Sequence, residues 1–159
     1  GLKYPEDDLS YIRESVSKFI SPGFELNTEI IPVTSKKAII LLEIPTGENK
    51  PYAVLDPEKD RRSVFYRVDD ECIKASRELK NILKHKNRQQ GQTIQYSELE
   101  ATVLKYIEQN GQVTKRELVN KTTFNSRSIS DCLVRLVTSK VLSIIPANSG
   151  DLFEYNQSG

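Results

Sequence analysis

Residues 97–140, SELEATVLKYIEQNGQVTKRELVNKTTFNSRSISDCLVRLVTSK, contain two capping-box patterns, in which Ser or Thr precedes Glu by three residues. Ser97 with Glu100 predicts the start of one helix, which Asn110-Gly111 ends. Thr114 with Glu117 predicts the start of a second, short helix. Two helices joined by a short extended segment around Val113 are therefore expected.

A third helix is predicted over residues 126–140, after a turn at 122–125. One face of this helix carries apolar residues at the spacing of a buried stripe: Ile129, Cys132, Leu133, Leu136 and Val137. The remaining residues are expected to be exposed: Arg127, Ser128, Ser130, Asp131, Val134 and Arg135. Asp131 is expected to form a local ion pair with Arg127 or Arg135.

Residues 141–145 and 152–155 are short apolar segments on either side of the turn-rich PANSGD at 146–151, which predicts a β-hairpin. Three helices followed by a hairpin, over residues 97–156, resemble the winged helix-turn-helix domains of bacterial regulators. The hairpin tip has no Lys or Arg and one Asp, so this wing is not expected to contact DNA.

The resemblance implies that the helix over 126–140 enters the major groove of DNA. The candidates for contact with base edges are Ser126, Arg127, Ser128, Ser130 and Arg135. The candidates for contact with phosphates are Lys115, Arg116 and Lys121. Six basic residues stand against two acidic ones between positions 112 and 140, a net charge of +4, which favours an anionic partner.

The N-terminal half mixes helix and strand patterns. An amphipathic helix is predicted over residues 7–20, and a hairpin over 28–32 and 37–44. A strand is predicted over 63–68 and a helix over 73–83.

The short motifs of this half contain Lys50, Pro51, Tyr52, Tyr66 and Arg67. Between residues 9 and 83 these motifs resemble the later half of the AlbA-2 domain, also called the Schlafen AlbA-like or divergent AAA-4 domain. Asp69 stands where the family usually has glycine, and Arg67 is expected to pair with neighbouring acids rather than to bind a phosphate. The family's earlier half has no counterpart here, so the chain is expected to be the C-terminal part of a larger protein.

These patterns predict an α+β protein with a partial AlbA-like α/β domain at 1–86, a linker at 87–96 and a winged helix-turn-helix domain at 97–159. The linker, NRQQGQTIQY, is polar and contains a glycine. The chain has 37% hydrophobic and 28% charged residues, which is typical of globular domains.

Several classes of protein are not expected. The longest apolar run, at 38–42, is far shorter than the roughly 20 residues of a membrane span, and no signal peptide opens the chain, so a cytoplasmic protein is predicted. Cys72 and Cys132 form no CxxC pair and His85 is the one histidine, so no metal, cofactor or disulfide framework is predicted. With no Walker-type glycine loop and no Ser/His/Asp set, no catalytic residues are proposed and the chain is not expected to be an enzyme.

The sequence therefore predicts a DNA-binding transcriptional regulator whose partner is double-stranded DNA. Its N-terminal domain would serve oligomerisation, DNA contact or ligand sensing, so a homo-oligomer is left open. Two alternatives remain: a fragment of a nuclease or ATPase whose active half is absent, and an assembly module that does not bind DNA.

Overall fold

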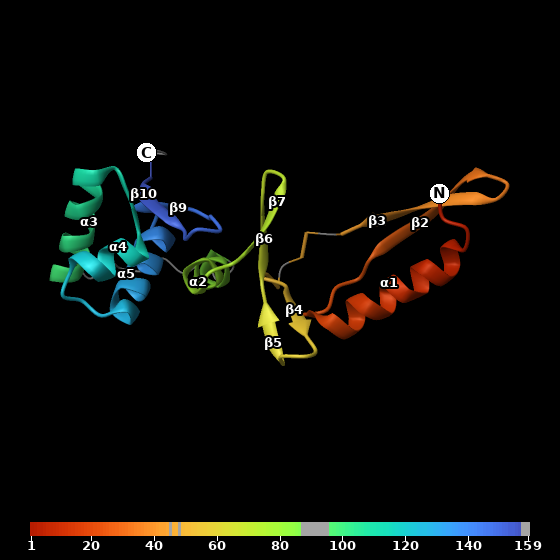
Figure 1. Ribbon diagram of the computed structural model, residues 1–159, viewed down its shortest axis with the longest axis horizontal. Helices are drawn as coiled ribbons and strands as arrows, with labels where there is room; N and C mark the ends of the chain where they lie inside the picture. The colour runs from red at the N-terminus through yellow and green to blue at the C-terminus, as the bar shows by residue number, and fades with distance from the viewer. Residues whose placement is uncertain (45, 48, 87–95, 157–159) are drawn as a thin grey trace. The chain divides into compact units, whose positions relative to one another are not determined.

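The computed structural model describes residues 1–44, 46–47, 49–86 and 96–156 (Figure 1). It divides into two compact units, Gly1–Ser63 and Val64–Gly159, and each mixes helices with small antiparallel sheets, as the predicted α+β class requires. The division differs from the predicted boundary at 87–96, of which residues 87–95 lie outside the described part of the chain. The segment 64–86 therefore belongs to the C-terminal unit.

The N-terminal unit begins with helix α1 (Pro5–Phe19), which has Pro at its start and three acids in its first turn, both favourable at a helix N-terminus. The predicted hairpin is confirmed as β2 (Asn27–Thr34) paired with β3 (Lys37–Glu43). Leu9 of α1 is buried, and Arg13 Nη2 donates to Thr28 Oγ1 at 2.6 Å, which ties the helix to β2.

A second sheet of this unit pairs β1 (Ile20–Ser21), β4 (Ala53–Asp56) and β5 (Arg61–Ser63) in antiparallel order β1-β4-β5. The rings of Phe24 and Tyr52 meet edge to face, with 5.1 Å between their centroids.

The C-terminal unit opens with a tight hairpin of β6 (Phe65–Val68) and β7 (Glu71–Lys74). Asp69 lies in its turn with φ 48°, a left-handed conformation that Asp and Asn tolerate better than most residues. Glycine adopts the same left-handed conformation without steric cost.

The helix predicted over 73–83 is wrong at its start, because Ile73 lies in β7 and helix α2 (Arg77–Lys86) begins only after it. The Ser76 hydroxyl accepts a hydrogen bond from the Leu79 N–H at 3.0 Å, which caps the first turn of α2. Ile73, which was counted in the apolar pattern of the predicted helix, thus belongs to the strand that precedes it.

The remaining elements follow in the predicted order: α3 (Glu98–Asn110), β8 (Gln112–Thr114), α4 (Lys115–Lys121), α5 (Ser126–Thr138), β9 (Leu142–Ile145) and β10 (Leu152–Tyr155). The sheet order is β8-β10-β9, with Phe153 paired to Val113 on one side and to Ile144 on the other. Gly111, with φ 78°, ends α3 and turns the chain into β8.

The core of this unit contains the predicted stripe of α5, each member of which is buried. Residues from the other elements complete it: Val103, Ile107, Val113, Leu118, Leu142 and Phe153. Ile82 of α2 belongs to the same apolar cluster and is 1% exposed. Helix α2 is therefore packed into this unit by its apolar face.

Candidate functional site

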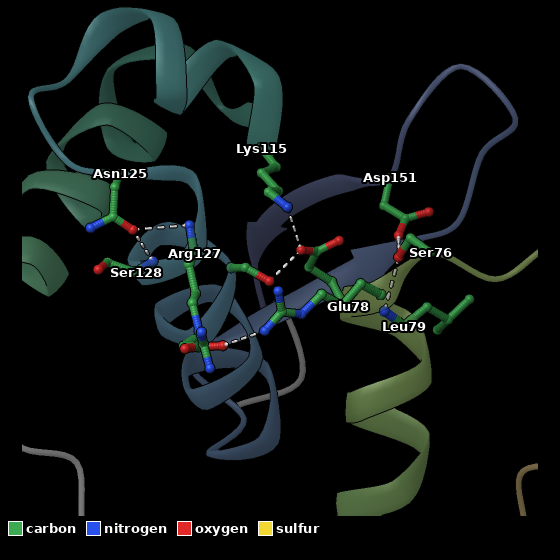
Figure 2. Close-up of polar contacts among 11 residues, drawn as sticks. Ser76, Glu78, Leu79, Lys115, Asn125, Arg127, Ser128 and Asp151 are labelled. Carbon is green, nitrogen blue, oxygen red and sulfur yellow. Dashed lines mark hydrogen bonds and ion pairs between the residues drawn. The ribbon is translucent and has the colours of Figure 1, made fainter.

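The start of α5 is fixed by Asn125, the residue that precedes the helix. The Asn125 Oδ1 accepts hydrogen bonds from the N–H groups of Arg127 at 3.1 Å and Ser128 at 2.9 Å, so it caps the helix (Figure 2). Ser126 and Arg127 are exposed and Ser128 is half-buried. Three of the five predicted base-contact residues therefore lie together in the first turn of α5, and two of them are exposed.

Helix α4 supplies the predicted phosphate contacts. The predicted capping box is confirmed, since Glu117 Oε2 accepts from the Thr114 N–H at 2.7 Å and from its hydroxyl at 2.8 Å. These hydrogen bonds lower the pKa of Glu117. Arg116 and Lys121 are exposed on this helix.

Lys115, the third predicted phosphate contact, is engaged by α2. Its Nζ donates to Glu78 Oε1 at 2.8 Å, and only 29% of its side chain is exposed (Figure 2). The prediction of Lys115 as a solvent-facing phosphate ligand is therefore corrected: in this structure it is the partner of a buried carboxylate.

Ser130 requires the same correction. It is 0% exposed, and its hydroxyl donates to the same carboxylate oxygen of Glu78. While α2 is in this position, the buried and already bonded hydroxyl of Ser130 is not available to a base edge. Val134, one turn further along α5, is also buried at 7% exposure although it was expected to be exposed.

Glu78 is thus the centre of a buried polar contact between three helices. Burial would raise the pKa of Glu78, but the hydrogen bonds from Lys115 and Ser130 outweigh it, and the pKa is lowered from its ordinary value. The group is therefore a carboxylate at neutral pH.

A second ion pair joins α2 to α5. Arg77 Nη2 lies 3.6 Å from Asp131 Oδ1, with both side chains about half exposed. Asp131 was expected to pair with Arg127 or Arg135 of its own helix, and its ion pair in the structure is with Arg77. Such an exposed pair adds little free energy, on the order of 0.5 kcal/mol, but it joins the same two helices as the bond between Glu78 and Ser130.

Arg135, the last predicted base contact, has a structural partner instead. Its Nη2 donates to Glu100 Oε1 on α3, and Glu100 is 0% exposed. Burial would raise the pKa of Glu100, but hydrogen bonds from Ser97 and Arg135 lower it to about 2. Arg135 therefore neutralises a buried acid in this structure, and its predicted contact with a base stays a prediction.

The acid at the hairpin tip has a structural role. Asp151 is 9% exposed, accepts from the Ala147 N–H at 3.3 Å and accepts from the hydroxyl of Ser76 at the start of α2. Asn148 Nδ2 donates to Glu71 Oε2 of β7 at 3.2 Å. The loop between β9 and β10 thus contacts the hairpin and helix that precede α3 in the sequence.

The residues of the predicted AlbA-like motif fall in different units. Lys50, Pro51 and Tyr52 belong to the N-terminal unit, and Tyr66 and Arg67 to β6 of the C-terminal unit. The expected pairing of Arg67 is confirmed, since its Nη2 lies 3.5 Å from Asp70 Oδ1 and its Nε donates to the Asp69 carbonyl at 2.9 Å.

The contact of Ser76, Arg77 and Glu78 with the C-terminal elements was not predicted. One signal was present: Glu78 lies next to Leu79 and one turn before Ile82, so a single acid stands on the apolar face of its helix. A charge at such a place is rarely buried without a partner. The predicted linker, however, assigned this helix to a separate domain.

Within the described ranges no group of three or more His, Cys, Asp and Glu side chains is placed to hold a metal ion. Cys72 is exposed and Cys132 is buried, and both are free thiols. No helix in the part that the structure describes is long and apolar enough to span a membrane. No family model, no curated protein and no solved structure matches this chain.

Proposed function

We propose that residues 97–156 form a winged helix-turn-helix domain that binds double-stranded DNA, and that the chain acts as a transcriptional regulator in the cytoplasm. The order of α3, β8, α4, α5 and the β9–β10 hairpin supports this assignment, as does the position of β8 at the edge of the three-stranded sheet. In such a domain α5 is the recognition helix.

The observation that carries the proposal is the first turn of α5. Ser126 and Arg127 are exposed there, at the end that recognition helices direct toward base edges. A guanidinium such as that of Arg127 can donate two hydrogen bonds to a guanine, and Ser126 and Ser128 can bond to several bases.

Arg116 and Lys121 are the proposed phosphate contacts. Both are exposed on α4, which is joined to α5 by residues 122–125 alone. Cations at these positions would orient the domain on the duplex without reading its sequence. Ser130, Arg135 and Lys115 are not among the proposed contacts of the arrangement described here, because each is bonded within the protein.

The resemblance of residues 9–83 to an AlbA-2 domain stays a prediction, as does a homo-oligomer. Two copies would place two recognition helices on a duplex about 34 Å apart, one helical turn of DNA.

The proposal is tested by titrating a fluorescent duplex with the protein at several salt concentrations. Each phosphate contact contributes about 0.9 to the slope of log K against log salt, so Arg116→Ala with Lys121→Ala is expected to reduce the slope by about 1.8. Lys105→Ala, which removes an exposed cation of α3, is the control and should leave the slope unchanged. An unchanged slope in the double variant would exclude these two residues as phosphate contacts.

A further inference from the structure

Helix α2 contacts part of the side of α5 that does not belong to the core stripe. Ser130 and Val134 lie on that side, yet they are 0% and 7% exposed. Asp131, between them, pairs with Arg77 of α2. Part of the surface that a recognition helix would present to DNA is therefore occupied by another helix of the same chain.

The width of the major groove makes this contact significant. The groove is about 12 Å wide, and an α-helix with its side chains has a diameter of about 10–12 Å, so the groove admits one helix. With α2 against part of its outer side, α5 is too wide to enter the groove beyond its first turn.

The contact between α2 and the helices α4 and α5 also occupies groups that could bind DNA phosphates. Glu78 takes up the Lys115 ammonium and the Ser130 hydroxyl, two donors of the kind that hold phosphate oxygens in protein–DNA complexes. Its carboxylate thus satisfies the groups that an anionic ligand would satisfy. The contacts at Arg77 and Ser76 are also polar and can be exchanged for water.

We propose that α2 is an intramolecular inhibitor of DNA binding, which covers α5 and must move away before α5 enters the groove. This inference rests on the proposed function. The structure is then the covered form, in which the first turn of α5 and the cations of α4 support only weak, salt-dependent binding. When α2 is released, Lys115 and Ser130 become accessible to DNA.

The effect on DNA affinity follows from the fraction of molecules in which α2 has moved away from α5; these are called open. The apparent Kd equals the intrinsic Kd divided by that fraction, so a helix that covers α5 about 90% of the time weakens binding about tenfold. Removing the contact should recover this factor.

The releasing variant is Glu78→Ala, which removes the partner of Lys115 and Ser130. Because loss of any acid favours binding to DNA, the matched control is Glu108→Ala, which removes an exposed acid from α3. We expect Glu78→Ala to bind duplex about tenfold more tightly than the control variant.

The locking variant joins α2 to the β9–β10 loop. Ser76 and Asp151 are in hydrogen-bond contact, so Ser76→Cys with Asp151→Cys is the pair chosen for a disulfide, and Cys72→Ser removes the exposed native thiol. Oxidised and reduced forms of this one protein are compared in the same titration, with disulfide formation measured by thiol counting. The oxidised form should bind about tenfold or more weakly than the reduced form.

The outcomes are distinct. Tighter binding by Glu78→Ala, or weaker binding by the locked form, supports the inhibitory role. Equal binding of duplex by the wild type, Glu78→Ala and both redox forms overturns it and leaves the proposed function intact. If none of these proteins binds duplex, the proposed function fails and the inhibitory role fails with it.

Discussion

Glu78 on α2 accepts a hydrogen bond at 2.8 Å from Lys115 at the start of α4, although 37 residues separate the two in the sequence. The contact joins a helix that the sequence assigned to one domain with a helix that it assigned to another. It also gives a predicted DNA ligand an internal partner. Together with the bond from Ser130, it makes α2 part of the C-terminal unit.

The first prediction concerns the protection of α2 against hydrogen exchange. Glu78→Ala removes hydrogen bonds to a charged group, and such bonds contribute about 1.5–3 kcal/mol to stability. Local opening of α2 should therefore become at least about tenfold more frequent. Mass spectrometry of deuterium uptake is expected to show faster exchange at residues 77–86 and little change in α3. Unchanged exchange in α2 would mean that Ile82 and its apolar neighbours hold the helix without Glu78.

The second prediction concerns Glu100 and pH. The pKa of Glu100 is lowered to about 2, so its contribution to stability is fully present above its ordinary value of 4.5 and is lost as the pH falls toward 2. Glu100→Gln should lower the free energy of unfolding by about 2 kcal/mol at pH 7, since it removes hydrogen bonds to a charged group. The difference from the wild type should shrink between pH 4.5 and 2, as measured by urea unfolding.

The control for this prediction lies in the same helix turn. Glu98→Gln changes an exposed acid of α3 and should leave stability nearly unchanged at every pH. A pH-independent loss in Glu100→Gln would show that the carboxylate charge is not what Arg135 and Ser97 stabilise.

The third prediction concerns the cap of α5. Asn125→Ala leaves the N–H groups of Arg127 and Ser128 without their side-chain acceptor and should cost about 1 kcal/mol of stability. Asn125→Asp retains an acceptor and should restore most of this loss. Thermal unfolding followed by circular dichroism measures both variants, and equal melting temperatures for Ala and Asp would contradict the capping role.

The fourth prediction concerns the two thiols. Cys132 is 0% exposed, and burial, with the nearby Glu100 carboxylate, raises its pKa to about 12, so its thiol should react only when the unit unfolds. Cys72 is exposed and should react under native conditions. A thiol reagent should therefore count one fast group in the wild type and none in Cys72→Ser.

Local signals in the sequence predicted the C-terminal elements well. The two capping boxes, the stripe from Ile129 to Val137 and the glycine at 111 each depend on residues within a few positions of one another, and the structure confirms all of them. The start of α5 at Ser126 is confirmed as well.

Contacts between distant residues were beyond this kind of prediction. Ser130 and Val134 lie outside the core stripe, so periodicity alone predicted that they are exposed. Both are buried, and Ser130 is bonded to Glu78 of α2, about 50 residues earlier in the sequence. For the same reason Asp131 was assigned to its own helix neighbours and not to Arg77. Periodicity shows which face of a helix is apolar, but it does not show which other element covers the polar face.

The most direct test of the central claim is the affinity of Arg127→Ala for a duplex selected by the wild type from a random pool. If Arg127 reads a base from the first turn of α5, the variant should lose about 1–3 kcal/mol of binding free energy on the selected duplex and much less on an unselected one. Arg127→Lys, which keeps the charge and loses the two-pronged geometry, should recover only part of this loss. Equal affinity of the wild type and Arg127→Ala for the selected duplex would contradict the assignment of α5 as the recognition helix.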